Sequence, residues 1–148
     1  MENTAVNELN AFLKGEIMAV EAYQNYIDGT QEQRIKDEFL RIQKDHKKHM
    51  EIISDRIKAL GGEPEKGTGF AGIMSNTKLK LENVMGRNPF DTLKDAYDGE
   101  DKGVAKAEEI VKGDLDPESR GLIQGILKQD HEHLSRMAHL IADYEIKH

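Results

Sequence analysis

The sequence predicts an all-α protein, a four-helix bundle made of two antiparallel helical hairpins joined by a long crossover. Three observations support this fold class. Apolar residues recur at helical spacing over four long stretches, and glycine or proline marks the boundaries of those stretches. One pattern of polar residues occurs twice, 84 residues apart, which indicates a duplicated hairpin. A chain of 148 residues has the size of one domain, so residues 1–148 are expected to share a single core.

The first predicted hairpin covers residues 4–61. Its first helix runs from about residue 4 to residue 28 and carries a one-sided apolar stripe: Val6, Leu9, Phe12, Leu13, Ile17, Val20, Tyr23 and Ile27. Gly29 is expected to end this helix. Thr30 is expected to cap the next helix, with Gln33 completing a capping box. Because the turn between the two helices is so short, they must run antiparallel.

Residues 62–89 are predicted to form the crossover. This segment is glycine-rich at its start, too long for a tight turn and long enough to cross the end of a bundle. The second hairpin, residues 90–147, is predicted to begin with a helix over about residues 91–112. Asp116 then supplies an N-cap, and Pro117 the first helical position, for a last helix that continues to the C-terminus.

Composition excludes several classes of function. The chain has no cysteine, which excludes disulfides, thiolate metal sites, iron–sulfur clusters and cysteine nucleophiles. Its net charge of −7 does not suit a phosphate-binding surface, so no nucleic-acid partner is expected. There is neither a signal peptide nor an apolar run long enough to span a bilayer. We therefore expect a cytoplasmic protein without a membrane partner.

The duplicated pattern consists of residue types that bind metal ions. Each half places a glutamate on its first helix and two ligand-type residues, three positions apart, on its second helix. The six residues are Glu16, His46 and His49 in the first half, and Glu100, Asp130 and His133 in the second. Residues at i and i+3 share one face of a helix, and antiparallel packing brings the glutamate opposite them. We therefore predict that all six side chains meet inside the bundle as metal ligands.

The register of the repeat allows one alternative. An offset of 85 residues would align His46 with His131 and Asp45 with Asp130. The offset of 84 residues is preferred because it keeps both the glutamates and the apolar stripes aligned. Glu21, Asp45 and His131 each lie about one turn from the six residues and are further candidate ligands.

Two glycines also match across the repeat. Gly15 and Gly99 each directly precede the glutamate of their half, although glycine lowers the stability of a helix. The matched pair predicts that helices approach each other closely near the site. Tyr23, about two turns after Glu16, is expected to pack in the core with its hydroxyl group hydrogen-bonded.

The arrangement of two hairpins, each with a glutamate and then a ligand-x-x-histidine motif, resembles the ferritin-like superfamily, in particular rubrerythrins and bacterioferritins. The resemblance covers nearly the whole chain in helix order and ligand placement. The family places Glu-x-x-His on its second and fourth helices. The matching residues here read His46-Lys47-Lys48-His49 and Asp130-His131-Glu132-His133. One bridging carboxylate has therefore become a histidine and the other has become an aspartate.

The resemblance implies a pair of iron ions in the bundle core, with manganese or zinc as alternatives, since carboxylates and imidazole suit these metals. It also implies a reaction with dioxygen or peroxide, of a ferroxidase or peroxidase type, without assigning a catalytic residue. Metal ions and a small oxidant are the expected partners, and a homodimer is the default assembly. The alternative is a stress-associated scaffold that has lost the metal centre. A hemerythrin-like oxygen carrier ranks last, because the first and third helices contain no histidine.

Overall fold

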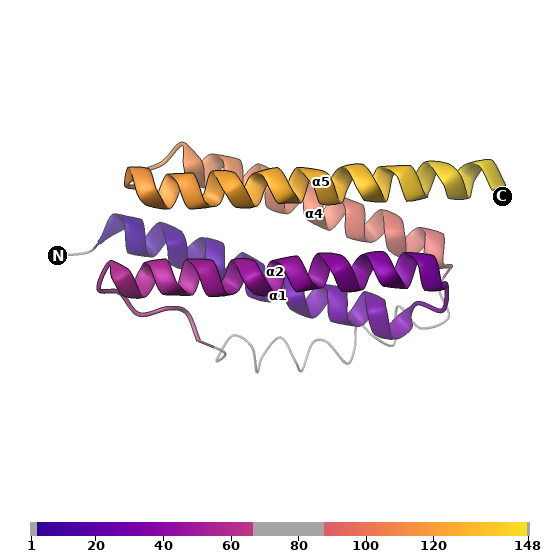
Figure 1. Cartoon of the computed structure of the whole chain (residues 1–148), viewed down its shortest axis with the longest axis horizontal. Helices are drawn as coiled ribbons and strands as arrows, with labels where there is room; N and C mark the ends of the chain where they lie inside the picture. The colour runs from indigo at the N-terminus through magenta and orange to yellow at the C-terminus, as the bar shows by residue number, and fades with distance from the viewer. Residues whose placement is uncertain (1–2, 67–87, 148) are drawn as a thin grey trace.

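The computed structural model describes residues 3–66 and 88–147, which contain four α-helices (Figure 1). The helices are α1 (Thr4–Gly29), α2 (Gln33–Ala59), α4 (Pro89–Val111) and α5 (Pro117–Lys147). α1 packs mainly on α2, and α4 mainly on α5, so the two predicted hairpins are confirmed. α2 ends and α4 begins at opposite ends of the bundle (Figure 1). Most of the predicted crossover, residues 67–87, lies outside the described residues.

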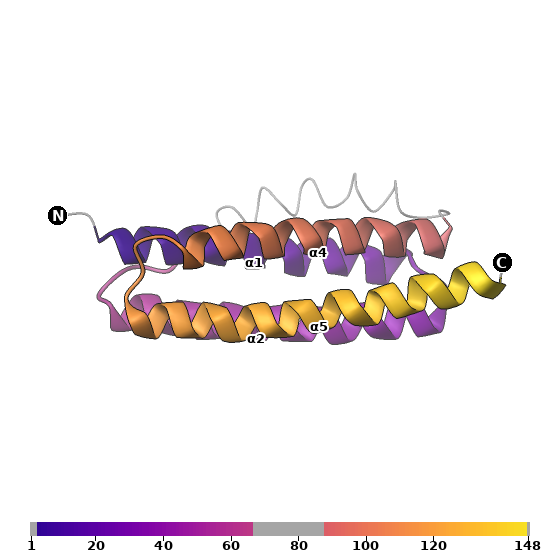
Figure 2. The same cartoon turned by 90° about the horizontal axis from the view of Figure 1, so that it is seen from above.

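The four helices form two layers. Figure 2 shows α1 and α4 side by side in one layer, and α2 and α5 in the other. Each hairpin therefore contributes one helix to each layer. This arrangement matters for the site, because a side chain that points inward from any helix faces side chains from both hairpins.

The capping box predicted at Thr30 is wrong. α1 extends through Gly29, Thr30 is its C-cap, and the side chain of Glu32 caps α2 by accepting the backbone N–H groups of Arg34 and Ile35. Because α1 continues through Gly29 and Thr30 closes it, the cap of α2 falls to Glu32, whose carboxylate also suits the positive end of the helix.

The start of the second hairpin is also shifted. α4 begins two residues earlier than predicted, because Asn88 caps it and its first helical residue is proline. The cap predicted for α5 is confirmed, since Asp116 Oδ2 accepts the backbone N–H of Ser119 at 3.0 Å.

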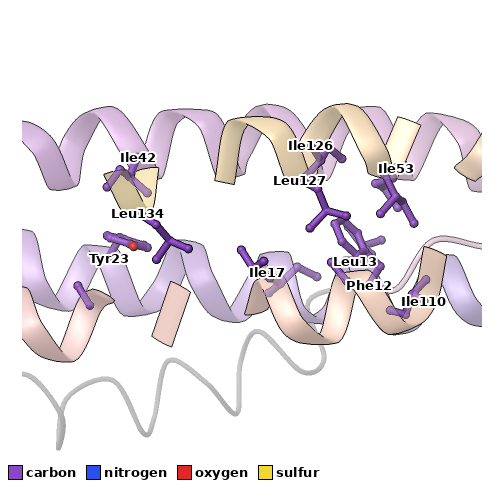
Figure 3. Close-up of a cluster of buried hydrophobic side chains, with 14 of the residues drawn as sticks. Phe12, Leu13, Ile17, Tyr23, Ile42, Ile53, Ile110, Ile126, Leu127 and Leu134 are labelled. Carbon is purple, nitrogen blue, oxygen red and sulfur yellow. The ribbon is translucent and has the colours of Figure 1, made fainter. Parts of the chain in front are cut away.

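The predicted apolar stripes form the core, but a polar layer interrupts them. Figure 3 shows two groups of buried apolar side chains along the bundle: Tyr23, Ile42 and Leu134 in one, and Phe12, Leu13, Ile53, Ile126 and Leu127 in the other. On α2, His46 and His49 lie between Ile42 and Ile53 and are nearly as buried as these two isoleucines. The centre of the bundle is therefore polar, with an apolar layer on each side.

Candidate metal centre

The structure brings all six residues of the repeat together in the interior. α1 and α4 contribute one residue each, α2 and α5 contribute two each, and none is more than 6% exposed. Their ligand atoms fall into two sets whose members lie within 4.8 Å of one another: Glu16, His46 and His49, and His46, Glu100, Asp130 and His133. Burial of so many ionisable groups is costly unless each finds a partner.

His46 lies between the two glutamates. Its Nδ1 is 2.6 Å from Glu16 Oε2 and its Nε2 is 2.7 Å from Glu100 Oε1. The ring stacks on Tyr23, whose hydroxyl donates a hydrogen bond to Glu100 Oε1 at 3.1 Å, as predicted. Burial alone would lower the pKa of His46, but the contacts with Glu100 and Glu16 outweigh it and raise that pKa well above its ordinary value. Without a metal ion, a doubly protonated His46 donates to both carboxylates.

The three carboxyl groups titrate differently. Burial favours the neutral form of Glu100, but its contacts with His133 and His46 outweigh burial and lower its pKa to about 2. The pKa of Glu16 is lowered in the same way by His46 and His49. Burial and the charges of Glu100 and Glu16 instead raise the pKa of Asp130 to about 7. The contacts with the histidines thus hold Glu16 and Glu100 in their anionic form, which is the form that would bind a cation.

Three buried atoms in this centre have no hydrogen-bond partner among residues 3–66 and 88–147: His49 Nδ1, His133 Nδ1 and Asp130 Oδ1. Asp130 Oδ1 is 3.5 Å from the His133 nitrogen and 3.9 Å from the His49 nitrogen. These separations exceed hydrogen-bonding distance, so each atom is left to bind an ion, Asp130 and His133 in one set and His49 in the other. Imidazole nitrogens and carboxylate oxygens are donors that bind iron, manganese or zinc, so the residues present fit such ions.

In His49 and His133, the ring nitrogen that faces away from the centre is held by a residue of the opposite hairpin. His49 Nε2 donates to Gln129 Oε1 at 2.6 Å, and His133 Nε2 donates to Asp45 Oδ2 at 2.8 Å. Because Nε2 is held by the opposite hairpin in both rings, Nδ1 is the nitrogen that faces the centre. Metal-ligating histidines are commonly oriented in this way.

Comparison with known proteins agrees with the fold. The model of a domain family, described as a domain of unknown function (DUF2383), matches residues 4–113. The chain belongs to the DUF2383 family. The matched range contains α1, α2 and α4, so it includes four of the six residues of the centre, and Asp130 and His133 lie beyond it. A search of curated proteins finds no match.

Two solved structures show the ferritin-like fold of this DUF2383 member. A two-domain protein from Anabaena variabilis, with DJ-1/ThiJ/PfpI-like and ferritin-like domains, is 20% identical with a TM-score of 0.80. The alignment covers 95% of this chain but only 39% of that protein. A dodecameric thioferritin from Bacteroides fragilis, described as bacterioferritin-related, is 19% identical with a TM-score of 0.76, over 97% of this chain and 88% of the other. At these identities the likeness establishes the fold alone.

The further candidate ligands of the DUF2383 chain lie outside both sets. Asp45 holds the outer nitrogen of His133 instead of facing the centre. His131 is exposed, with its Nε2 3.5 Å from Glu108 Oε1, as the 84-residue register requires. Glu21 is buried but belongs to neither set. Sequence reasoning missed Gln129; its signal was that Gln129 directly precedes Asp130, just as Asp45 directly precedes His46.

A cleft of about 440 Å³ opens beside the centre, between α1 and α4. Small residues form much of its walls, among them Ala11, Gly15, Ala19, Ala96, Gly99 and Gly103, and Glu16, His46, Glu100 and Asp130 reach it from the centre. A Cβ atom added at Gly15 or Gly99 would meet no other atom of the described residues within 4 Å. Among these residues, the predicted close approach of helices at the two glycines is therefore wrong. None of the helices in residues 3–66 and 88–147 combines the length and apolar character needed to cross a bilayer.

Proposed function

We propose that this protein binds a pair of transition-metal ions, iron or manganese, among its six buried ligand-type residues, and that the centre reacts with dioxygen or peroxide. The observation that carries the proposal is the set of three unpartnered buried atoms on His49, His133 and Asp130. Buried polar atoms are nearly always hydrogen-bonded, and each exception costs on the order of 1–3 kcal/mol. Two bound cations would supply the missing partners, one beside Glu16 and His49 and the other beside Asp130 and His133.

The residues take distinct roles in this proposal. His49 and His133 are terminal imidazole ligands, and Glu16 and Glu100 are carboxylate ligands from the opposite layer. His46 and Asp130 occupy the inner positions. The ions, when bound, supply the redox chemistry. The chain would hold them between its two apolar layers. Tyr23 keeps its proton and fixes Glu100, because burial and the nearby Glu100 carboxylate raise the pKa of Tyr23 well above its ordinary value.

Metal analysis of protein purified without chelator tests the proposal. About two transition-metal ions per chain are expected, and Glu16→Ala combined with Glu100→Ala should remove most of them. The matched control is Glu51→Ala combined with Glu109→Ala, which changes two exposed glutamates on α2 and α4 and should leave the metal content unchanged. Absorbance after adding Fe(II) in air then separates an oxidising centre from an inert one. Equal metal content in both double variants would refute the ligand set.

A second candidate is a scaffold bundle without a metal centre, and one observation favours it. His46 already joins Glu16 to Glu100 at hydrogen-bonding distances, so these three buried groups are satisfied without an ion. The scaffold predicts no bound metal and no change of melting temperature when a chelator is added. Metal binding predicts a large change, since an ion present at 1,000 times its dissociation constant stabilises the fold by about 4 kcal/mol.

The oligomeric state of the protein can be measured separately. The homodimer expected from the sequence and the dodecamer named for the Bacteroides fragilis protein differ sixfold in mass. Light scattering of the purified protein distinguishes them, and also a monomer. Cytoplasmic location stays a prediction from the sequence.

A further inference from the structure

We infer that His46 bridges two metal ions, binding one through Nδ1 and the other through Nε2, in the position where a carboxylate bridge would otherwise stand. The inference rests on the proposed metal binding and adds to it how the two ions are connected. Its starting point is that the two sets of ligand atoms have a single residue in common, and this residue is His46.

The geometry of the ring supports the inference. The two nitrogens of an imidazole point away from each other, so they cannot bind one ion together. In this structure Nδ1 faces Glu16, which belongs to one set, and Nε2 faces Glu100, which belongs to the other. Each nitrogen is therefore already beside a carboxylate that would bind the same ion.

The ring is also held in this orientation. One face stacks on Tyr23, with ring centroids 5.6 Å apart and an interplanar angle of 24°. The rings of His49 and His133 lie 5.5 Å and 5.4 Å away in edge contacts. A rotation of His46 that took both nitrogens away from the glutamates would break these contacts as well as two hydrogen bonds.

The charges balance when His46 bridges. Glu16, Glu100 and Asp130 supply three negative charges, whereas two divalent ions carry four positive ones. As the ions bind, each ring nitrogen of His46 gives up its hydrogen, and both protons leave to water. The resulting imidazolate supplies the fourth negative charge. The four carboxylates of the ferritin-like di-metal arrangement supply the same total.

A ring bridge has a measurable consequence. In two-metal sites the ions lie roughly 3.5–4 Å apart. With the width of an imidazole between them, the ions in this protein must lie farther apart than that.

Crystals of the protein loaded with Co(II) alone test the inference through anomalous difference maps at the cobalt edge. Two peaks separated by more than about 4 Å, one on each side of His46, are expected. Two peaks within about 4 Å of each other, or a His46 that binds one ion and keeps its contact to a glutamate, would overturn the bridge. If elemental analysis finds no cobalt at all, the proposed function has failed instead.

Two glutamine variants give an independent test in solution. His46→Gln should weaken the binding of both ions. The loss of affinity should exceed the roughly 10-fold to 100-fold loss seen when a residue that only orients a metal ligand is removed. The matched variant His49→Gln changes a residue of only one set and should weaken one ion only. If His46→Gln also affects one ion alone, the bridge is refuted. His46→Glu restores a carboxylate bridge, so in cobalt-loaded crystals it should keep both ions and bring them to about 3.5–4 Å. If the variants do not fold, the wild-type separation decides the question alone.

Discussion

His49 in the first hairpin donates its outer N–H to the amide oxygen of Gln129, whereas His133 in the second hairpin donates to the carboxylate of Asp45. A carboxylate partner makes an imidazole a stronger metal ligand than an amide partner does. Asp130, too, belongs to the set of the second hairpin. The two halves thus place equivalent residues at equivalent positions but differ in charge. The repeat therefore preserves the positions of the ligand residues but makes two unequal sites. We expect the ion beside His133 to bind more tightly.

The largest expected effect comes from removing one glutamate at a time. Glu100→Gln should weaken the tighter ion by more than about 100-fold, because it removes a direct ligand and not merely an outer partner. Glu16→Gln should weaken the looser ion and leave the tighter one nearly unchanged. Competition against a chelator of known affinity measures both, with Glu109→Gln on the exposed face of α4 as the control. Equal losses in the two variants would show that the halves are equivalent.

Acid should destabilise the metal-free protein through Glu100. Its pKa is lowered from 4.5 to about 2, so it contributes stability that is present above pH 4.5 and is lost as pH falls from there toward 2. The loss is on the order of 3 kcal/mol. Urea unfolding of the metal-free protein between pH 5 and pH 2.5 measures this loss. Glu100→Gln should flatten the dependence of the unfolding free energy on pH in this range. A profile that is unchanged in this variant would contradict the assignment.

Asp130 should affect the pH dependence of stability in the opposite direction. Its pKa is raised from 3.8 to about 7, so its contribution to stability is present below pH 3.8 and is lost as pH rises toward 7. Asp130→Asn is neutral at every pH and should make the metal-free protein more stable than wild type near pH 7, while weakening metal binding. Comparing the unfolding of this variant with that of Glu100→Gln separates the electrostatic effects of the two carboxyl groups from metal binding.

The outer partners offer the sharpest test of the inequality. Asp45→Asn gives both halves an amide partner and should weaken the tighter ion about 10-fold to 100-fold. Gln129→Glu gives both halves a carboxylate partner and should strengthen the looser ion. Titration calorimetry on both variants measures the change, and unfolding of the metal-free proteins checks that the fold is intact. If Asp45→Asn leaves both affinities unchanged, the partner of His133 does not tune the site.

The sequence predicted the hairpins and the convergence of all six buried residues, because helical spacing fixes which residues share a face. It did not reveal the pairing of Gln129 with His49, since that contact joins two hairpins and depends on their relative position in space. The cap at Glu32 was missed for a different reason: Thr30 and Glu32 both suit an N-cap, and the length of α1 decides between them. Whether the six residues bind metal is a prediction that fold and geometry leave to experiment.

The smallest expected effect concerns the matched glycines, where the two halves should behave alike. Gly15 and Gly99 lie inside helices, and an added Cβ atom would meet no atom of the structurally described part of the chain within 4 Å at either position. Gly15→Ala and Gly99→Ala should therefore each stabilise the metal-free protein by about 0.5–1 kcal/mol, because alanine restricts the unfolded chain and favours the helix. Urea unfolding measures the gain. A loss of stability in either variant would mean that something occupies the cleft beside that glycine. A loss in only one of them would show that the halves also differ in packing, and not in charge alone.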